Sequence, residues 1–389
     1  MKKGNIKMHT KNRKNQNQSN KSQLSQNLNT IKSLHKNENS NFTKIQSDST
    51  VINTIIYYIV FLLLASSFLV FIDKFQFRQQ KYFFEIKDDT PFAFLIENIG
   101  NEYFSPKFSK IFYILIIDSL IYAFFSNLHC DLDFSIFYIL IITLESGFTS
   151  YVQSFHSLFL HSFLIFFELY LYCVFLHTRA YKLKWYLLCT LIAFLTTLDF
   201  CLRVEAISFA FSFISIIIIS IHKTNLLTSP YRIITWKEIA LIVFLCISTV
   251  FIVLFTFYNT IGLPKFIWLP LSIGDIIDEY KISQWNITLI IIEVISLFFI
   301  KYAQLNSYNT FMICILLICL FSVSIIPAYS GETAVITKVF EFKLILVLLT
   351  GIILGRQPRL YLTILIALLG ILTSWIYRYN FIPLDYQFY

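Results

Sequence analysis

The chain contains a long series of apolar runs, and these constrain its fold more than any other feature. Taking ~20 apolar residues per membrane span, we count roughly eleven candidates, at 51–72, 111–126, 134–146, 157–176, 185–201, 206–221, 239–260, 287–303, 310–326, 344–354 and 360–377. Hydrophobic residues make up 57% of the 389 residues and charged residues only 14%, which is more apolar surface than a water-soluble domain can bury. The sequence therefore predicts an all-α polytopic membrane protein, with one transmembrane domain over 51–389.

Residues 1–50 are of a different kind. They are rich in Asn, Gln, Ser and Lys and have almost no apolar periodicity, which is typical of a disordered tail. This tail holds 10 of the 31 basic residues and 2 of the 23 acidic ones, so it carries the whole net charge of +8 and the remainder balances (21 − 21). We therefore predict no nucleic-acid partner. A strongly basic flank before the first span also predicts a cytoplasmic N-terminus.

The connections between the candidate spans alternate in charge. With a cytoplasmic N-terminus, the connections on that side are short and mostly basic, namely 127–133, 177–184, 222–238, 302–309 and 355–359. The far-side connections carry most of the remaining carboxylates and are 73–110, 147–156, 262–286 and 327–343. Because Lys and Arg accumulate in cytoplasmic loops, this alternation supports the predicted orientation.

A short acidic segment lies in the first far-side loop. Asp88 and Asp89 come just before Thr90, a suitable N-cap, and Pro91, a residue type favoured at the first helical position. The apolar residues that follow recur with helical spacing and are Phe92, Leu95, Ile96 and Ile99. With Gly100 as the stop signal, the pattern predicts a short amphipathic helix that lies along the membrane interface.

The acidic pair stands at the positive end of this helix dipole, which favours the ionised carboxylates. Asp88 and Asp89 are therefore suited to accept a proton or to bind a cation. The alternative is that they form an acidic cap on a surface helix and have no further role.

A second group of charges lies within Leu198–Ile219, where two candidate spans meet with almost no loop. Asp199, Arg203 and Glu205 fall near the far-side boundary, and charges at membrane depth usually pair with one another or line a wet cavity. One interpretation is that Arg203 forms an ion pair with a neighbouring carboxylate and thereby stabilises a helical hairpin. The other is that its guanidinium binds the phosphate of a lipid headgroup.

Weaker candidates lie on the same side. Glu145, at the far-side end of the third span, could join one cavity with His156 and His161, although single residues of this sort are often interfacial hydrogen-bonders. Lys338, in the connection 327–343, could neutralise a phosphate or snorkel to the membrane surface.

These motifs resemble the polyprenyl-phosphate-sugar glycosyltransferases of the GT-C superfamily. The resemblance is carried by the basic N-terminus, one span, and a far-side loop in which an Asp-Asp pair precedes an apolar helix ending Glu97-Asn98-Ile99-Gly100. The segment Arg203-Val-Glu205-Ala is similar to the family's Arg-x-Glu-Gly span start, with Ala206 in place of the Gly. Leu95 and Ile96 stand where the family often has an Arg-Tyr pair.

The resemblance implies an inverting transfer of a sugar from a dolichyl- or polyprenyl-phosphate donor to a lipid-linked glycan or a protein acceptor. It implies that Asp88 or Asp89 is the general base, while the other orients it or holds a divalent cation such as Mg²⁺ or Mn²⁺. Arg203 and, second, Lys338 would bind the leaving phosphate. Glu145 and Glu205 would support the site.

Two other functions are open. A non-catalytic GT-C-like subunit of a lipid-glycan or glycan-anchor complex would share the architecture, and a membrane transporter would need charged groups that converge at mid-membrane. The expected compartment is the endoplasmic reticulum membrane in a eukaryote, or the inner or plasma membrane in a bacterium.

Overall fold

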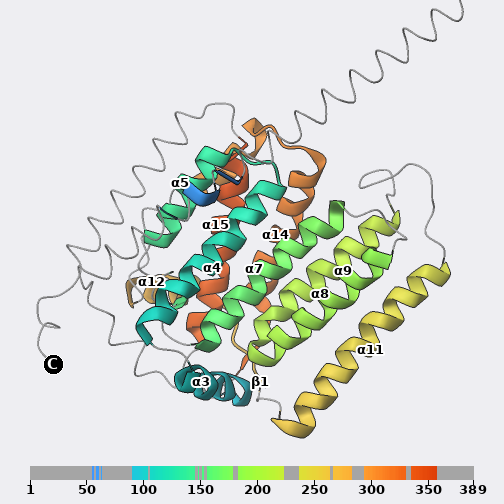
Figure 1. Cartoon of the computed structure of the whole chain (residues 1–389). Helices are drawn as coiled ribbons and strands as arrows, with labels where there is room; N and C mark the ends of the chain where they lie inside the picture. The colour runs from blue at the N-terminus through green and yellow to red at the C-terminus, as the bar shows by residue number, and fades with distance from the viewer. Residues whose placement is uncertain are drawn as a thin grey trace, which may run out of the picture. The chain divides into compact units, whose positions relative to one another are not determined.

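The computed structural model (Figure 1) describes residues 55–56, 58–60, 63, 90–103, 106–144, 148, 151–152, 156–177, 183–222, 236–262, 266–282, 293–329 and 334–356. The chain divides into two units, Met1–Val60 and Phe61–Tyr389, and all the labelled elements belong to the second. The predicted disordered tail, residues 1–50, lies outside the described residues.

The described part of the chain is helical except for one pair of very short strands. Its α-helices are α3 (Pro91–Tyr103), α4 (Pro106–Asn127), α5 (Leu132–Leu144), α7 (His156–His177), α8 (Leu183–Leu202), α9 (Ile207–His222), α11 (Trp236–Thr260), α12 (Ile273–Ile282), α14 (Ser307–Ile325) and α15 (Ala334–Leu354). The 3₁₀ turns are η1 (Val204–Ala206) and η2 (Phe298–Tyr302). The strands β1 (Phe266–Ile267) and β2 (Ala328–Tyr329) pair antiparallel, with Phe266 opposite Tyr329.

The predicted membrane class agrees with these helices. Four stretches are long and apolar enough to cross a bilayer, and they are His156–Leu176, Leu183–Leu202, Lys237–Thr260 and Tyr308–Ile325. In several other helices the apolar residues are not confined to one face, as expected of helices surrounded by lipid or by other helices. The predicted span at 360–377 lies outside the described residues.

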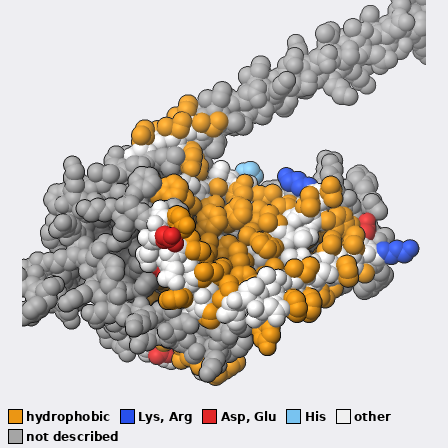
Figure 2. All heavy atoms as spheres, turned by 60° about the horizontal axis from the view of Figure 1, so that its bottom comes forward, with side chains coloured by type: hydrophobic (Ala, Val, Ile, Leu, Met, Phe, Trp, Pro, Cys, Tyr) orange, Lys and Arg blue, Asp and Glu red, His pale blue; other side chains and the backbone are white. Residues whose placement is uncertain are grey.

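The helices pack in an order close to that of the chain. Helix α7 lies between α4 and α8, and α8 also contacts α11, which forms the edge of this row (Figure 1). Helix α14 packs against both α9 and α15. The outer face of α11 leaves Phe244, Phe251 and Phe255 more than half exposed, and Figure 2 shows hydrophobic side chains over much of the described surface with only scattered charges. This surface is suited to contact lipid.

The connections meet in two groups, one at each end of the helices. At one end, β1 pairs with β2, β2 contacts η1, and α3 contacts α7. At the other end, Nη1 of Arg356 donates to the carbonyl of His129 at 2.7 Å and its Nε donates to that of Gln304 at 3.1 Å. The first group contains segments of the predicted far-side connections, and the second contains segments of the predicted cytoplasmic ones.

Two predicted boundaries are wrong. Helix α15 begins at Ala334, so the second half of the predicted loop 327–343 is helical. The sequence concealed these turns of helix because Lys338 and Glu341 interrupt the apolar run, whereas in the fold both side chains are fully buried. Helix α3 starts at Pro91 as predicted but continues past Gly100 to Tyr103.

Gly100 serves close packing and does not end a helix. A Cβ at this position would lie 2.3 Å from the imidazole of His156, so only glycine lets α3 approach α7 this closely. The buried face of α3 is formed by Phe92, Ala93 and Gly100. Leu95 and Ile99, predicted to share a face with Phe92, are 39% and 44% exposed, which leaves them available to lipid.

Helix α12 has a capping box that sequence reading did not identify. The backbone N–H of Asp275 donates to Oγ of Ser272 at 3.1 Å, and the N–H of Ser272 donates to Oδ2 of Asp275 at 2.9 Å. The Ser272 hydroxyl also donates to Oδ2, and these hydrogen bonds lower the pKa of the Asp275 carboxyl below its ordinary value. The box fixes the start of α12 between the strand β1 and the contact with α15.

Replacing Gly351 with Ala should lower the free energy of unfolding by about 1–2 kcal/mol through overpacking, in spite of the gain in helix propensity. The added Cβ would lie 2.2 Å from Cζ of Phe125 and 2.9 Å from Cε1 of Tyr138, and both rings are buried. The matched control is Gly274→Ala, whose Cβ would meet nothing nearer than Oγ of Ser272 at 3.5 Å. Unfolding of both variants in detergent micelles makes the comparison. A Gly351→Ala protein as stable as the wild type would contradict the close approach of α15 to α4 and α5.

Candidate functional site

A group of ionisable side chains is buried where α7, α8, η1 and α15 meet. We call this group the buried ionisable cluster, and its members are His161, Glu168, Asp199, Arg203, Glu205, Lys338 and Glu341. Each of them is at most 3% exposed. Such residues are rare inside membrane proteins and usually mark a functional path or site, so the cluster is the strongest candidate site in the part of the chain that the structure describes.

His161 links three helices at the centre of the cluster. Its Nδ1 lies 2.7 Å from Oδ1 of Asp199, which comes from α8. Its Nε2 lies 2.8 Å from Oε1 of Glu341, on α15, although the two atoms are not aligned as in a hydrogen bond. One imidazole of α7 therefore stands between two carboxylates from different helices.

Glu168 lies two turns along α7 from His161, on the same side of the helix. The hydroxyl of Thr196 donates to Oε2 of Glu168 at 3.0 Å and also lies 2.9 Å from the carbonyl of Ile192. Because Thr196 has a single hydroxyl proton, it divides this proton between the two acceptors. Among the described residues, Oε1 of Glu168 has no hydrogen-bond donor.

The turn between α8 and α9 buries Arg203 and Glu205. Arg203 is extended, with φ −142° and ψ 126°, and its backbone N–H donates to the carbonyl of Asp199 at 2.7 Å. The single 3₁₀ turn η1 then leads into α9, so the chain reverses without leaving the bundle. The guanidinium of Arg203 is close enough to Asp199 and Glu205 to act on their charges. Neither carboxylate oxygen of Glu205 accepts a hydrogen bond from the described residues.

Lys338 lies in the second turn of α15 and not in a loop. Its Nζ donates to the backbone carbonyls of Leu269 and Ile326, so it ties α15 to the segment after β1 and to the end of α14. The predicted alternative of snorkelling to the membrane surface is wrong, because the side chain is fully buried. The carboxylates of Glu205 and Glu341 are close enough to act on its charge.

Helix α3 is fixed at the end of the bundle that holds this cluster. Oε1 of Glu97 accepts a hydrogen bond from the backbone N–H of Ser157 at 2.7 Å, which places a carboxylate at the positive end of α7. The hydroxyl of Tyr113 pairs with Nδ1 of His156, and the ring of Phe92 packs edge-on against Phe257 of α11 at 4.6 Å. The middle of α3 therefore lies at the first turn of α7, and its first turn packs against α11.

Some of the predicted site residues are described by the structure, and others are not. Arg203, Glu205 and Lys338 belong to one cluster, although Lys338 is far from the other two in the sequence. Asp88, Asp89 and Glu145 lie outside the described residues, and so does the predicted cation site at the aspartates. Within the described ranges, no group of three or more His, Cys, Asp or Glu side chains is arranged to hold a metal ion.

Sequence reasoning missed two members of the cluster, Glu168 and Glu341. Glu168 had a usable signal, because it is a single carboxylate in the middle of the 22-residue apolar helix α7. Glu341 had a weaker one, since it follows Lys338 by three residues in a segment that was predicted to be a loop.

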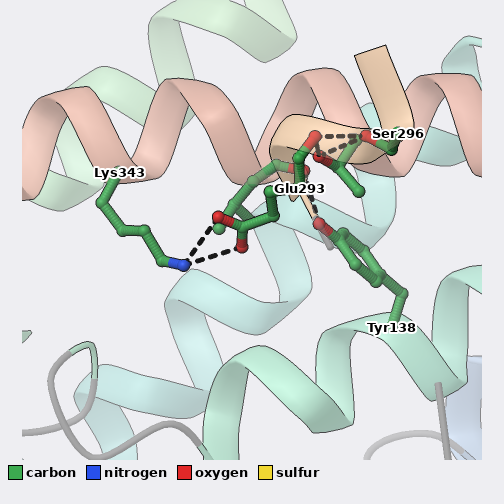
Figure 3. A network of polar contacts seen from close by, with 6 residues as sticks. Tyr138, Glu293, Ser296 and Lys343 are labelled. Carbon is green, nitrogen blue, oxygen red and sulfur yellow. Dashed lines mark hydrogen bonds and ion pairs between the residues drawn. The ribbon is translucent and has the colours of Figure 1, made fainter. Parts of the chain in front are cut away.

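A separate ion pair lies farther along α15 (Figure 3). Nζ of Lys343 donates to Oε1 and Oε2 of Glu293 at 2.8 and 2.7 Å. Close by, the hydroxyl of Ser296 donates to the carbonyl of Glu293 at 2.6 Å, and Tyr138 donates to the carbonyl of Val347 at 2.8 Å. Here the two charges neutralise each other, unlike those of the buried ionisable cluster.

Comparison of the chain with protein-family models, with curated proteins and with solved structures finds no match. Inference about function therefore starts from the residues and their geometry.

Proposed function

We propose that the chain is a membrane glycosyltransferase of the GT-C type. It would transfer a sugar from a dolichyl- or polyprenyl-phosphate donor to a lipid-linked glycan or protein acceptor, with inversion at the anomeric carbon. One observation supports this most: Arg203, Glu205 and Lys338 come together in one buried cluster, at the end of the bundle where α3 is anchored. In the sequence, α3 directly follows Asp88 and Asp89, and we propose that this acidic pair acts together with the phosphate ligands of the cluster.

The proposed topology has about eleven spans of ~20 residues and a cytoplasmic N-terminus. The cluster and α3 would then lie toward the lumenal or periplasmic face, in the endoplasmic reticulum membrane of a eukaryote or the inner or plasma membrane of a bacterium. The grouping of the connections at two ends of the helices supports this alternation.

In the proposed reaction, Asp88 or Asp89 removes the proton of the acceptor hydroxyl as its oxygen attacks the anomeric carbon. The bond to the phosphate oxygen breaks, and Arg203 with Lys338 stabilises the negative charge on the leaving lipid phosphate. Glu205 and Glu145 would hold these groups in place. A divalent cation, Mg²⁺ or Mn²⁺, would bind at the second aspartate if the reaction needs one.

The polyprenyl tail of the donor would lie along α3. This helix exposes Phe94, Leu95 and Ile99, with Phe94 63% exposed, while its opposite face is packed on α7. An apolar stripe on a helix fixed at the end of the bundle is suited to hold an isoprenoid chain beside the site.

Binding of the lipid phosphate tests this proposal. Polyprenyl phosphate should raise the melting temperature of the purified protein in a dose-dependent way, and Arg203→Lys should raise its Kd by tenfold or more, since an ammonium cannot form the bidentate contact. The control is Lys237→Gln, an exposed cation in α11 that should leave binding unchanged.

The melting temperature without ligand separates weak binding from poor folding. An Arg203→Lys protein that melts like the wild type and binds the lipid equally well would reject Arg203 as the phosphate ligand. A protein that binds the lipid but transfers no sugar would correspond to the alternative function, a non-catalytic subunit of a lipid-glycan complex.

A further inference from the structure

The buried ionisable cluster has more acidic than basic groups. Its carboxyl groups belong to Glu168, Asp199, Glu205 and Glu341. The positive charges are at most those of Arg203, Lys338 and a protonated His161. If every carboxyl group were ionised, the described members would keep at least one net negative charge, and burying an unbalanced charge is costly.

The same carboxyl groups lack hydrogen-bond donors. Among the described residues, Oε1 of Glu168, Oδ2 of Asp199, both oxygens of Glu205 and both oxygens of Glu341 accept no hydrogen bond. Other groups that face them do not supply donors: Tyr172 donates to the carbonyl of Phe209 at 2.9 Å, and Cys319 lies 2.8 Å from Oγ of Ser212. Several fully buried acceptor oxygens therefore lack a hydrogen-bond donor, which a bound proton would supply.

These observations point to one class of ligand. We propose that the buried ionisable cluster is a proton-binding site, in which at least one proton is held among Glu205, Glu341 and Glu168. A proton both removes the excess charge and turns an acceptor oxygen into a donor for its neighbour. The described residues offer no arrangement for a metal ion, which would otherwise neutralise the same charge.

His161 adds a second kind of titratable group to this site. Its two ring nitrogens face Asp199 on α8 and Glu341 on α15, at 2.7 and 2.8 Å. An imidazole can accept a proton at one nitrogen and release another from the second. The imidazole of His161 therefore lies between carboxyl groups from two other helices, α8 and α15.

The ion pair between Glu293 and Lys343 of α15 serves as a contrast to the cluster. Both oxygens of Glu293 accept from one ammonium, so this carboxylate has neither excess charge nor a vacant acceptor. The proposed proton site does not depend on sugar transfer, because it would operate equally in a proton-coupled transporter.

Infrared spectroscopy of the protein in lipid bilayers tests the inference. The wild type should show the C=O stretch of a protonated carboxylic acid at neutral pH, and the band should shift when H₂O is replaced by D₂O. Glu168→Gln, Glu205→Gln and Glu341→Gln should each be compared with Asp275→Asn, whose carboxylate is exposed and hydrogen-bonded to Ser272. We expect the band to be lost or reduced by half or more in at least one of the three cluster variants and unchanged in Asp275→Asn.

Two results would overturn the proposal. One is a wild-type spectrum without a protonated carboxyl band at neutral pH, or with a band that all three cluster variants retain. The other is a cluster that is fully ionised and stabilised by Na⁺ or K⁺ at constant pH, which would assign it to a cation. Neither result depends on glycosyltransferase activity, so the proton site and the proposed function can fail separately.

Discussion

Replacing Lys343 with Met is expected to lower the free energy of unfolding by about 3–5 kcal/mol, the usual cost of removing one partner of a buried ion pair. Met fills much of the volume of Lys but leaves the carboxylate of Glu293 buried without its cation. The side chains are 0% and 4% exposed, and both oxygens of Glu293 are bonded to Nζ of Lys343. Because a single ammonium contacts both oxygens of Glu293, its removal should cause a large loss in the free energy of unfolding.

The double variant Glu293→Leu/Lys343→Met isolates the cause. If the loss comes from an uncompensated charge, removing both charges should recover most of the stability. Lys301→Met is the control, because Lys301 is exposed at η2 and should change the stability by less than about 0.5 kcal/mol. Unfolding by a denaturing detergent measures all three. A Lys343→Met protein that unfolds at the wild-type midpoint would show that this pair contributes nothing.

Replacing Asp88 and Asp89 one at a time with Asn is expected to reveal the proposed general base. Loss of a general base typically costs a factor of ~10²–10⁴ in turnover, because the acceptor hydroxyl must then attack without transfer of its proton. We expect one single variant to show this loss, and the other a smaller one that reflects orientation or cation binding. The assay is transfer of a labelled sugar from a polyprenyl-phosphate donor in membranes with matched protein levels.

Asp275→Asn is again the appropriate control, since Asp275 is a partly exposed carboxylate in another predicted far-side connection. It should leave the turnover unchanged. Full activity in both Asp88→Asn and Asp89→Asn would eliminate the acidic pair from the mechanism. Loss of activity in wild-type protein after removal of divalent cations, with recovery on adding Mg²⁺ or Mn²⁺, would assign the second aspartate to a metal.

Sequence reasoning found the elements of this fold where a single helix carries its own signal. The apolar runs predicted α7, α8, α11 and α14 to within a few residues, and Pro91 correctly marked the start of α3. The extent of α15 was missed because its first turns contain Lys338 and Glu341, which look like loop residues until their partners on other helices are known.

The candidate site was predictable only in part for the same reason. Arg203 and Glu205 were identified because they interrupt two neighbouring spans. The contact of His161 with Glu341, however, joins residues on α7 and α15, and no local pattern in one sequence shows which helices will touch. Gly100 was misread likewise: a glycine late in a helical pattern normally ends the helix, and only the nearby His156 shows its other use.

The charges of α15 also constrain the order in which the protein can be assembled. Lys338, Glu341 and Lys343 occupy one helix, and a Lys or Asp at the centre of a span costs about 2.5–3.5 kcal/mol during insertion by the translocon. An isolated α15 would therefore resist entry into the bilayer. Its partners His161 and Glu293 are made earlier, so they are present when the ribosome delivers this segment. A nascent chain stopped before α15 would keep Glu293 without the ammonium of Lys343.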